Sequence, residues 1–169
     1  ICSAVSEGLV ENSTLETLQL PLLDETDNPI ILHGVVWQEI FESNHSLTKL
    51  CFTEYSISLE AFQCLARGLS RNTSLESIDL SSSDMTDDCA IALVQGLKTN
   101  KTLKCLDLSN NCELSQSGRA AIELLMGYNV LRELNLVKTA GSVGASILTS
   151  GLSDNCSLEK LDFESAFVD

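Results

Sequence analysis

Aromatic residues, proline and basic residues are all scarce in this chain. Aromatics make up 5% of the 169 residues and only two prolines occur, so a hydrophobic interior has to be filled by leucine, isoleucine, valine and alanine. Ten basic residues stand against 24 acidic ones, for a formal net charge of −14. Because phosphate backbones and anionic lipids attract basic proteins, we expect no nucleic acid and no membrane surface as partner. The charge either favours a basic protein partner or only keeps the chain in solution.

Long apolar runs and paired-cysteine motifs are also missing. No stretch approaches the roughly 18 apolar residues of a membrane helix, and residues 1–12 contain Glu7 and Glu11 but no basic start, unlike a signal peptide. The seven cysteines are odd in number and form no Cys-x-x-Cys pair. We therefore expect free thiols in a reducing, cytoplasmic (intracellular) environment. Zinc-ligand spacings and glycine-rich phosphate loops are absent, so we expect neither a metal nor a cofactor.

What the chain does contain is one sequence motif in six copies. Five copies read Asn, any residue, Ser or Thr, and Leu, as in residues 72–75, followed by apolar residues such as Ile78 and Leu80. The copy at residues 128–131 (Tyr-Asn-Val-Leu) is looser. The first leucines of the six copies stand at positions 15, 47, 75, 103, 131 and 158, so the steps are 32, 28, 28, 28 and 27 residues. A nearly constant step of this size predicts a solenoid of stacked repeats.

Each repeat has two hydrophobic periods. After the first leucine, apolar and polar residues alternate, which predicts a short strand. Before it, apolar residues recur at every fourth position, as at Ala61, Leu65 and Leu69, which predicts one buried face of a helix. The repeating unit is therefore strand, loop, helix and turn.

Capping residues and glycines agree with these helices. The predicted N-cap residues are Ser58, Thr86 and Ser115. The residues expected to end helices in the left-handed conformation are Asn44, Asn72, Asn100 and Asn155. A glycine also precedes the last inward leucine at Gly8, Gly68, Gly96 and Gly151. Because a helical glycine costs about 1 kcal/mol relative to alanine, its recurrence predicts that neighbouring elements approach closely there.

These residues resemble the leucine-rich repeats of the ribonuclease-inhibitor-like family. Residues 106–111 (Leu-Asp-Leu-Ser-Asn-Asn) and 78–81 (Ile-Asp-Leu-Ser) match its strand motif, and the 28-residue step matches its repeat length. The resemblance implies an α/β fold, a right-handed horseshoe-shaped solenoid with parallel strands on its concave face and helices on its convex face. The family often places asparagine after the strand, where this chain has Tyr55, Ser83, Thr139 and Ala166, which predicts loops with fewer hydrogen bonds.

We expect one leucine-rich-repeat domain over residues 1–169. It is divided into the end of a preceding repeat (1–14), five repeats (15–46, 47–74, 75–102, 103–130 and 131–157) and a partial repeat (158–169). Neither end shows a polar capping repeat, and the chain has no initiator methionine. The ends are therefore predicted to stack on further repeats of a larger protein or on another copy.

The polar strand residues between the leucines form the candidate binding face. The residues expected to contact a partner there are Lys49, Cys51, Ser77, Asp79, Cys105, Asp107, Glu133, Asn135, Lys160 and Asp162. Three of them, Asp79, Asp107 and Asp162, would form an anionic strip able to receive lysine or arginine from a partner. Alternatively, these aspartates belong to the strand motif alone, and their charge is neutralised locally by Lys104, Arg132 and Lys160.

The longer first interval predicts a loop insertion around Asp24, Glu25 and Asp27. It either carries binding specificity or is an inert surface insertion. Its acidic residues do not follow the order of a calcium-binding loop.

Three functions remain open. The first is a non-enzymatic scaffold that binds a protein partner on the concave face. The second is a GTPase-activating protein of the Ran activator type, for which Asn110 and Asn111 are the candidates at the strand-to-helix rim. The third is a structural or actin-capping repeat domain such as tropomodulin carries. Glycosylation sequons recur in the chain, but repetition of the structural unit explains them better than glycosylation.

Overall fold

The computed structural model describes residues 2–20, 34–53, 57–112, 114–139 and 151–163. Its helices are α1 (Cys2–Glu11), α2 (Gly34–Ser43), α3 (Leu59–Leu69), α4 (Asp87–Leu97) and α5 (Gln116–Met126). Its strands are β1 (Thr17–Gln19), β2 (Lys49–Cys51), β3 (Ser77–Asp79), β4 (Cys105–Asp107), β5 (Glu133–Asn135) and β6 (Lys160–Asp162). The predicted loop insertion with Asp24, Glu25 and Asp27 lies outside the described residues.

The six strands form one parallel sheet in the order of the chain. Each strand pairs with the next in a register that follows the repeat steps. The step is 28 residues from β2 to β5, so that Leu50 pairs with Ile78 and Ile78 with Leu106. Parallel neighbours require a crossover between them, and α2, α3, α4 and α5 supply it from β1 to β5. The alternation of strand and helix predicted from the two hydrophobic periods is confirmed.

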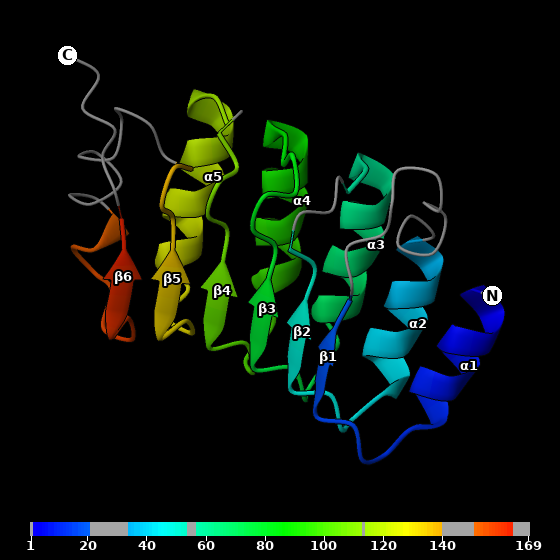
Figure 1. Ribbon diagram of the computed structural model, residues 1–169. Helices are drawn as coiled ribbons and strands as arrows, with labels where there is room; N and C mark the ends of the chain where they lie inside the picture. The colour runs from blue at the N-terminus through cyan, green and yellow to red at the C-terminus, as the bar shows by residue number, and fades with distance from the viewer. Residues whose placement is uncertain (1, 21–33, 54–56, 113, 140–150, 164–169) are drawn as a thin grey trace.

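The helices form a second row behind the sheet (Figure 1). Successive helices pack on one another, from α1 on α2 to α4 on α5. Strands lie about 4.8 Å apart whereas packed helices need about 8–10 Å. Figure 1 shows the helices spread wider than the strands, so the exposed sheet face is the concave side.

The interior consists of stacked layers of aliphatic side chains, one layer from each repeat. The central strand residues Leu50, Ile78, Leu106 and Leu134 are all at most 3% exposed. The first leucines of the inner repeats and the helix faces close around them, and the inward residues predicted for α3 and α4 are buried. Each large apolar side chain contributes about 1.5–3 kcal/mol on burial, much of which conformational entropy offsets.

Near the N-terminal end, a cluster of aromatic side chains takes the place of aliphatic ones in the core. Trp37 of α2 packs edge-on against Phe52, with ring centroids 4.8 Å apart, and lies 6.0 Å from Phe41. Phe62 of α3 is fully buried in the same core. Although aromatic residues are few in the chain, four of them are concentrated in the cores of two neighbouring repeats.

The predicted N-caps are confirmed. The side chains of Ser58 and Thr86 accept hydrogen bonds from the backbone N–H groups three residues later, and Ser115 accepts from Ser117. The capped helices α3, α4 and α5 each have 11 residues. These caps set where each helix begins and therefore how it meets the preceding strand loop.

The prediction that the recurring asparagines adopt a left-handed conformation is wrong. Positive φ angles among the described non-glycine residues occur elsewhere, at Ser82, Asp84, Asn110, Asn129 and Lys138. Instead, the asparagine side chains join neighbouring repeats. The Asn100 amide nitrogen donates to the Leu69 carbonyl oxygen (2.7 Å), while its amide oxygen accepts from the N–H groups of Thr102 and Leu103.

The equivalent asparagines repeat this arrangement. Asn44 donates to the Leu9 carbonyl oxygen, Asn72 to that of Phe41, and Asn155 to that of Met126. Asn44, Asn72 and Asn100 are at most 5% exposed. Buried backbone groups need hydrogen-bond partners, and this amide supplies both a donor and an acceptor. At three of the five sequons, those of Asn44, Asn72 and Asn100, the buried amide therefore has a structural role in the repeat.

Side-chain hydrogen bonds from Ser83, Asn111 and Thr139 hold the rim loops after the strands. The Asn111 side chain is 1% exposed and bonds to the carbonyl oxygens of Leu80 and Leu108 and to the N–H of Ser83. Ser83 and Thr139 substitute for asparagine because their hydroxyls donate to the same carbonyl groups, Leu80 and Leu108. The Ser83 and Thr139 hydroxyls nevertheless make fewer hydrogen bonds than the Asn111 amide, which agrees with the expectation for these loops. Tyr55 and Ala166 lie outside the described residues.

Close approach at the helical glycines is confirmed at three positions and wrong at one. A Cβ atom on Gly96 would lie 2.4 Å from the Ala66 carbonyl oxygen, and one on Gly68 would lie 2.9 Å from the Phe41 side chain. Gly151 faces Met126 at 3.0 Å, whereas a Cβ on Gly8 would have nothing within 4 Å. Only the glycines between packed helices are required by space.

Candidate functional site

The ten candidate residues lie in two columns on the concave face. Strand register aligns Lys49, Ser77, Cys105, Glu133 and Lys160 in one column. The second column, two residues later on each strand, contains Cys51, Asp79, Asp107, Asn135 and Asp162. Side chains two apart on a strand share a face, so both columns face away from the helices.

A shallow hollow of about 210 Å³ occupies the middle of this face. Nine of the ten candidates line it, all except Cys51, and residues Ile78, Leu106 and Leu134 contribute at the strand centres. In the first column the small side chains of Ser77 and Cys105 stand between the longer Lys49 and Glu133. The hollow was not predicted from the sequence, although the two small residues between two long ones in this column explain it.

Asp79 and Asp107 each bind the chain that follows their strand. The Asp79 carboxylate accepts from the Ser81 N–H (2.9 Å), and the Asp107 carboxylate accepts from the Ser109 N–H (2.8 Å). The second oxygen of Asp107 accepts from the Asn135 amide (2.8 Å). Both aspartates therefore support strand ends and at the same time leave negative charge on the concave face.

Neutral hydrogen bonds keep Asp79 ionised. Partial burial alone would raise its pKa, but the hydrogen bonds from Ser81, Cys51 and Thr53 outweigh burial, and the pKa is lowered from its ordinary value of 3.8. Thr53, whose hydroxyl donates to Asp79 at 3.0 Å, was not among the candidates. Its position after the strand offered no sequence signal for this role.

The predicted local neutralisation holds for one aspartate of the strip only. Lys160 lies 2.7 Å from the Asp162 carboxylate, and this contact raises the pKa of Lys160. The residues directly before the strands form a flanking column beside the other two. In it, Lys104 pairs with Glu76, and Arg132 with Glu159. These basic groups therefore leave Asp79 and Asp107 without an ion-pair partner among the described residues.

The two concave thiols are poor nucleophiles. Burial raises the pKa of Cys51, and the neighbouring Asp79 raises it further. Burial also raises the pKa of Cys105, as do the charges of Glu133 and Glu76. Because the pKa of each thiol is raised, both side chains are mainly protonated at neutral pH. The thiolate is the reactive form, so only a small fraction of each thiol can react there.

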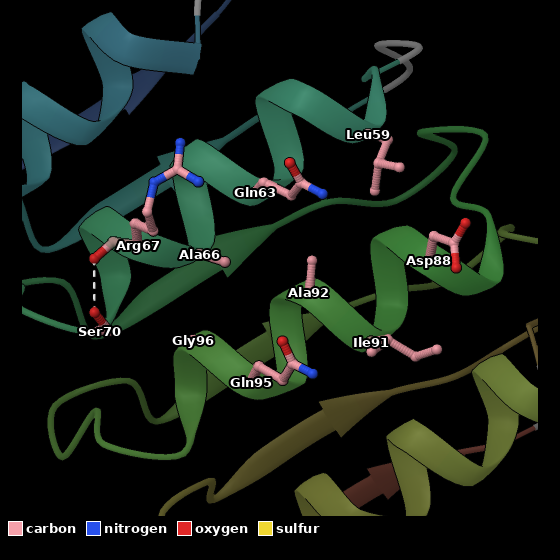
Figure 2. Close-up of a pocket in the computed structure, with 10 residues that line it drawn as sticks. All are labelled: Leu59, Gln63, Ala66, Arg67, Ser70, Asp88, Ile91, Ala92, Gln95 and Gly96. Carbon is pink, nitrogen blue, oxygen red and sulfur yellow. Dashed lines mark hydrogen bonds between the residues drawn. The ribbon is translucent and has the colours of Figure 1, made fainter.

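A second hollow lies on the convex side, between α3 and α4, and measures about 630 Å³. Figure 2 shows Gln63 and Gln95 projecting from the two helices, with Ala66 and Gly96 where the helices approach. Its one arginine, Arg67, already donates to Gln38 and Cys64. This groove therefore brings together no group of free charges or reactive side chains.

Metal-ligating side chains do not gather anywhere in the described part of the chain. Within those residues, no group of three or more His, Cys, Asp or Glu side chains is arranged to hold a metal ion. None of the helices described there has the length and hydrophobicity to cross a bilayer.

The comparisons with known proteins agree with this architecture. The "Leucine Rich repeat" family profile matches residues 71–94 and 99–122. A solved structure titled "Leiomodin-1 Actin-Binding Site 2 (ABS2)" is similar, with a TM-score of 0.68 and 24% sequence identity over 78% of this chain and 79% of that chain. A search of curated proteins gives no match. The chain therefore contains leucine-rich repeats and has the α/β leucine-rich-repeat fold.

Proposed function

We propose that this leucine-rich-repeat chain is a non-enzymatic scaffold that binds a basic protein partner on its concave strand face. Leucine-rich-repeat domains generally bind proteins, and the 28-residue step supports assignment to the ribonuclease-inhibitor-like type. The free thiols of the described cysteines are compatible with a reducing, intracellular setting.

The observation that carries this proposal is the uncompensated charge on the concave face. Asp79, Asp107 and Glu133 have no ion-pair partner among the described residues, whereas Glu76 and Glu159 of the flanking column are paired with Lys104 and Arg132. A net negative surface increases the association rate of a positively charged protein and helps to orient it. Screening by salt should therefore weaken the association.

The test compares proteins retained by the immobilised chain with those retained by two variants, identified by mass spectrometry. Glu133→Lys reverses a charge on the concave face, and Glu60→Lys reverses one in the first turn of α3 as the matched control. The proposal expects proteins that are lost with Glu133→Lys, kept with Glu60→Lys and released as salt is raised. A retained set that is identical for the wild-type chain and Glu133→Lys contradicts it.

Actin binding is a second candidate, because the similar solved structure is named as an actin-binding site of leiomodin-1. Co-sedimentation of the purified chain with filamentous actin tests it directly. Actin-dependent pelleting that Glu133→Lys weakens would make actin the partner of the concave face. The absence of pelleting at an excess of actin would remove this candidate.

The proposal also includes the absence of catalysis. We expect the chain to leave the rate of GTP hydrolysis by Ran unchanged. Acceleration of hydrolysis, lost on substitution of the exposed rim residue Asn110, would contradict the non-enzymatic assignment.

A further inference from the structure

We propose that the concave hollow receives a single lysine or arginine side chain of the partner, presented between residues that are not basic. This inference rests on the proposed function and specifies the chemistry that the concave face recognises.

The first argument is the space available. Ser77 and Cys105 are neighbours across β3 and β4, and both line the hollow. Lys49 on β2 and Glu133 on β5 flank them in the same column. One extended side chain can therefore enter above Ser77 and Cys105, with its aliphatic part over the small residues.

The second argument is the charge around that space. Glu133 pairs directly with Cys105 in the strand register, and Asp107 follows Cys105 by two residues on the same face. Asp79 is the register partner of Asp107 on β3. The charges of Glu133 and Glu76 act directly on Cys105, and those of Lys49 and Lys104 oppose them. Asp107 and Asp79 add negative charge on the same face, so a cationic group placed beside Glu133 is attracted to the carboxylates of this face.

The third argument is the charge on either side. The Lys49 side chain forms no hydrogen bond or ion pair with another described residue, so its positive charge remains at the edge of the hollow. On the other side Lys160 is already bound to Asp162. With strands about 4.8 Å apart, Lys49 lies two strands, or about 10 Å, from Cys105. If the partner presented several consecutive basic residues, one of them would lie near Lys49 and be repelled by it. A single basic residue in the hollow avoids this repulsion.

Cys105 allows the test while the partner is still unidentified. In thiol–disulfide exchange, the Cys105 thiolate attacks a symmetrical disulfide, forms a mixed disulfide and releases one thiol. Cystamine leaves a short cationic arm that resembles the end of a lysine side chain, and bis(2-hydroxyethyl) disulfide leaves a neutral arm of the same length. Equilibration of both reagents under a thiol buffer, followed by peptide mass mapping, gives the retention of each arm at Cys105.

The inference expects the cationic arm to be retained about two- to fivefold more than the neutral arm at Cys105, the range for one partly exposed ion pair. Glu133→Gln should reduce this preference and Lys49→Gln should increase it. The matched controls Glu60→Gln and Lys98→Gln remove the same charges at α3 and at the C-cap of α4, and they should leave the preference unchanged.

Equal retention of the two arms, or a preference that Glu133→Gln does not change, overturns the inference. Because the arms are bound covalently, this result is independent of partner capture. If the preference is absent but Glu133→Lys still loses its partner, the inference fails and the proposed function stands.

Discussion

The side-chain amide of Asn100 donates a 2.7 Å hydrogen bond to the carbonyl oxygen of Leu69, which lies in the preceding repeat. Its amide oxygen accepts from Thr102 at the end of its own repeat and from Leu103 at the start of the next. One buried side chain therefore connects the end of a helix, the turn after the next helix and the start of a strand. Stacked repeats have few covalent constraints between them, so such contacts help to set their spacing.

Removal of this amide should be costly. We expect Asn100→Ala to lower the free energy of unfolding by about 2–4 kcal/mol, because it leaves buried donors and acceptors without partners. Urea denaturation followed by circular dichroism measures the loss. The exposed neighbour Lys101→Ala should change it by less than about 0.5 kcal/mol. A loss for Asn100→Ala no larger than that of the control would contradict the structural role of the amide.

Two helical glycines should respond in opposite directions to alanine. Gly96→Ala places a methyl group against the backbone of Ala66, so we expect a loss of about 1–3 kcal/mol despite the better helix propensity of alanine. Gly8→Ala meets nothing within 4 Å and should be neutral or stabilising by up to about 1 kcal/mol. Thermal melts of both variants provide the comparison. Similar effects at the two sites would show that helix propensity, rather than space, governs both.

Lys138 carries a positive φ of 56° in the loop after β5. Lysine is disfavoured in this conformation whereas glycine adopts it freely, so Lys138→Gly should stabilise the chain by up to about 1 kcal/mol. Lys98, at the C-cap of α4, has a φ of −54°, and Lys98→Gly should destabilise it. Chemical denaturation of both variants checks this contrast. A loss of stability for Lys138→Gly would mean that its side chain has contacts more important than its backbone conformation.

Because Asp79 is ionised in the folded chain, the free energy of unfolding should decrease at acidic pH. Its folded pKa is below its ordinary value of 3.8, so its contribution is present above that value and is lost as pH falls through the folded pKa. We expect the wild-type chain to lose more stability than Asp79→Asn between about pH 5 and pH 2.5, because asparagine does not titrate. Urea midpoints across this range measure the difference. Parallel curves for the two proteins would contradict the lowered pKa of Asp79.

Much of the concave face was predictable from the sequence alone. With a constant repeat length, residues 28 apart must occupy equivalent places, so Ser77 and Cys105 could be assigned to one column from their positions in the chain. The same reasoning predicted the N-caps at Ser58 and Thr86, because capping is a local interaction. It could not predict which acid Lys104 contacts, since Glu76 and Asp107 are both near in a stacked sheet.

The sequence by itself determined the strand and helix of each repeat, the parallel order and the residues that face inward, because these follow from hydrophobic period and repeat length. Only the tertiary structure decided the role of Asn100, the space at Gly96 and Gly8, and the hollow at Ser77 and Cys105. Each of these depends on atoms of a neighbouring repeat. The distances between such atoms are set by how whole repeats pack, a property that no single repeat encodes.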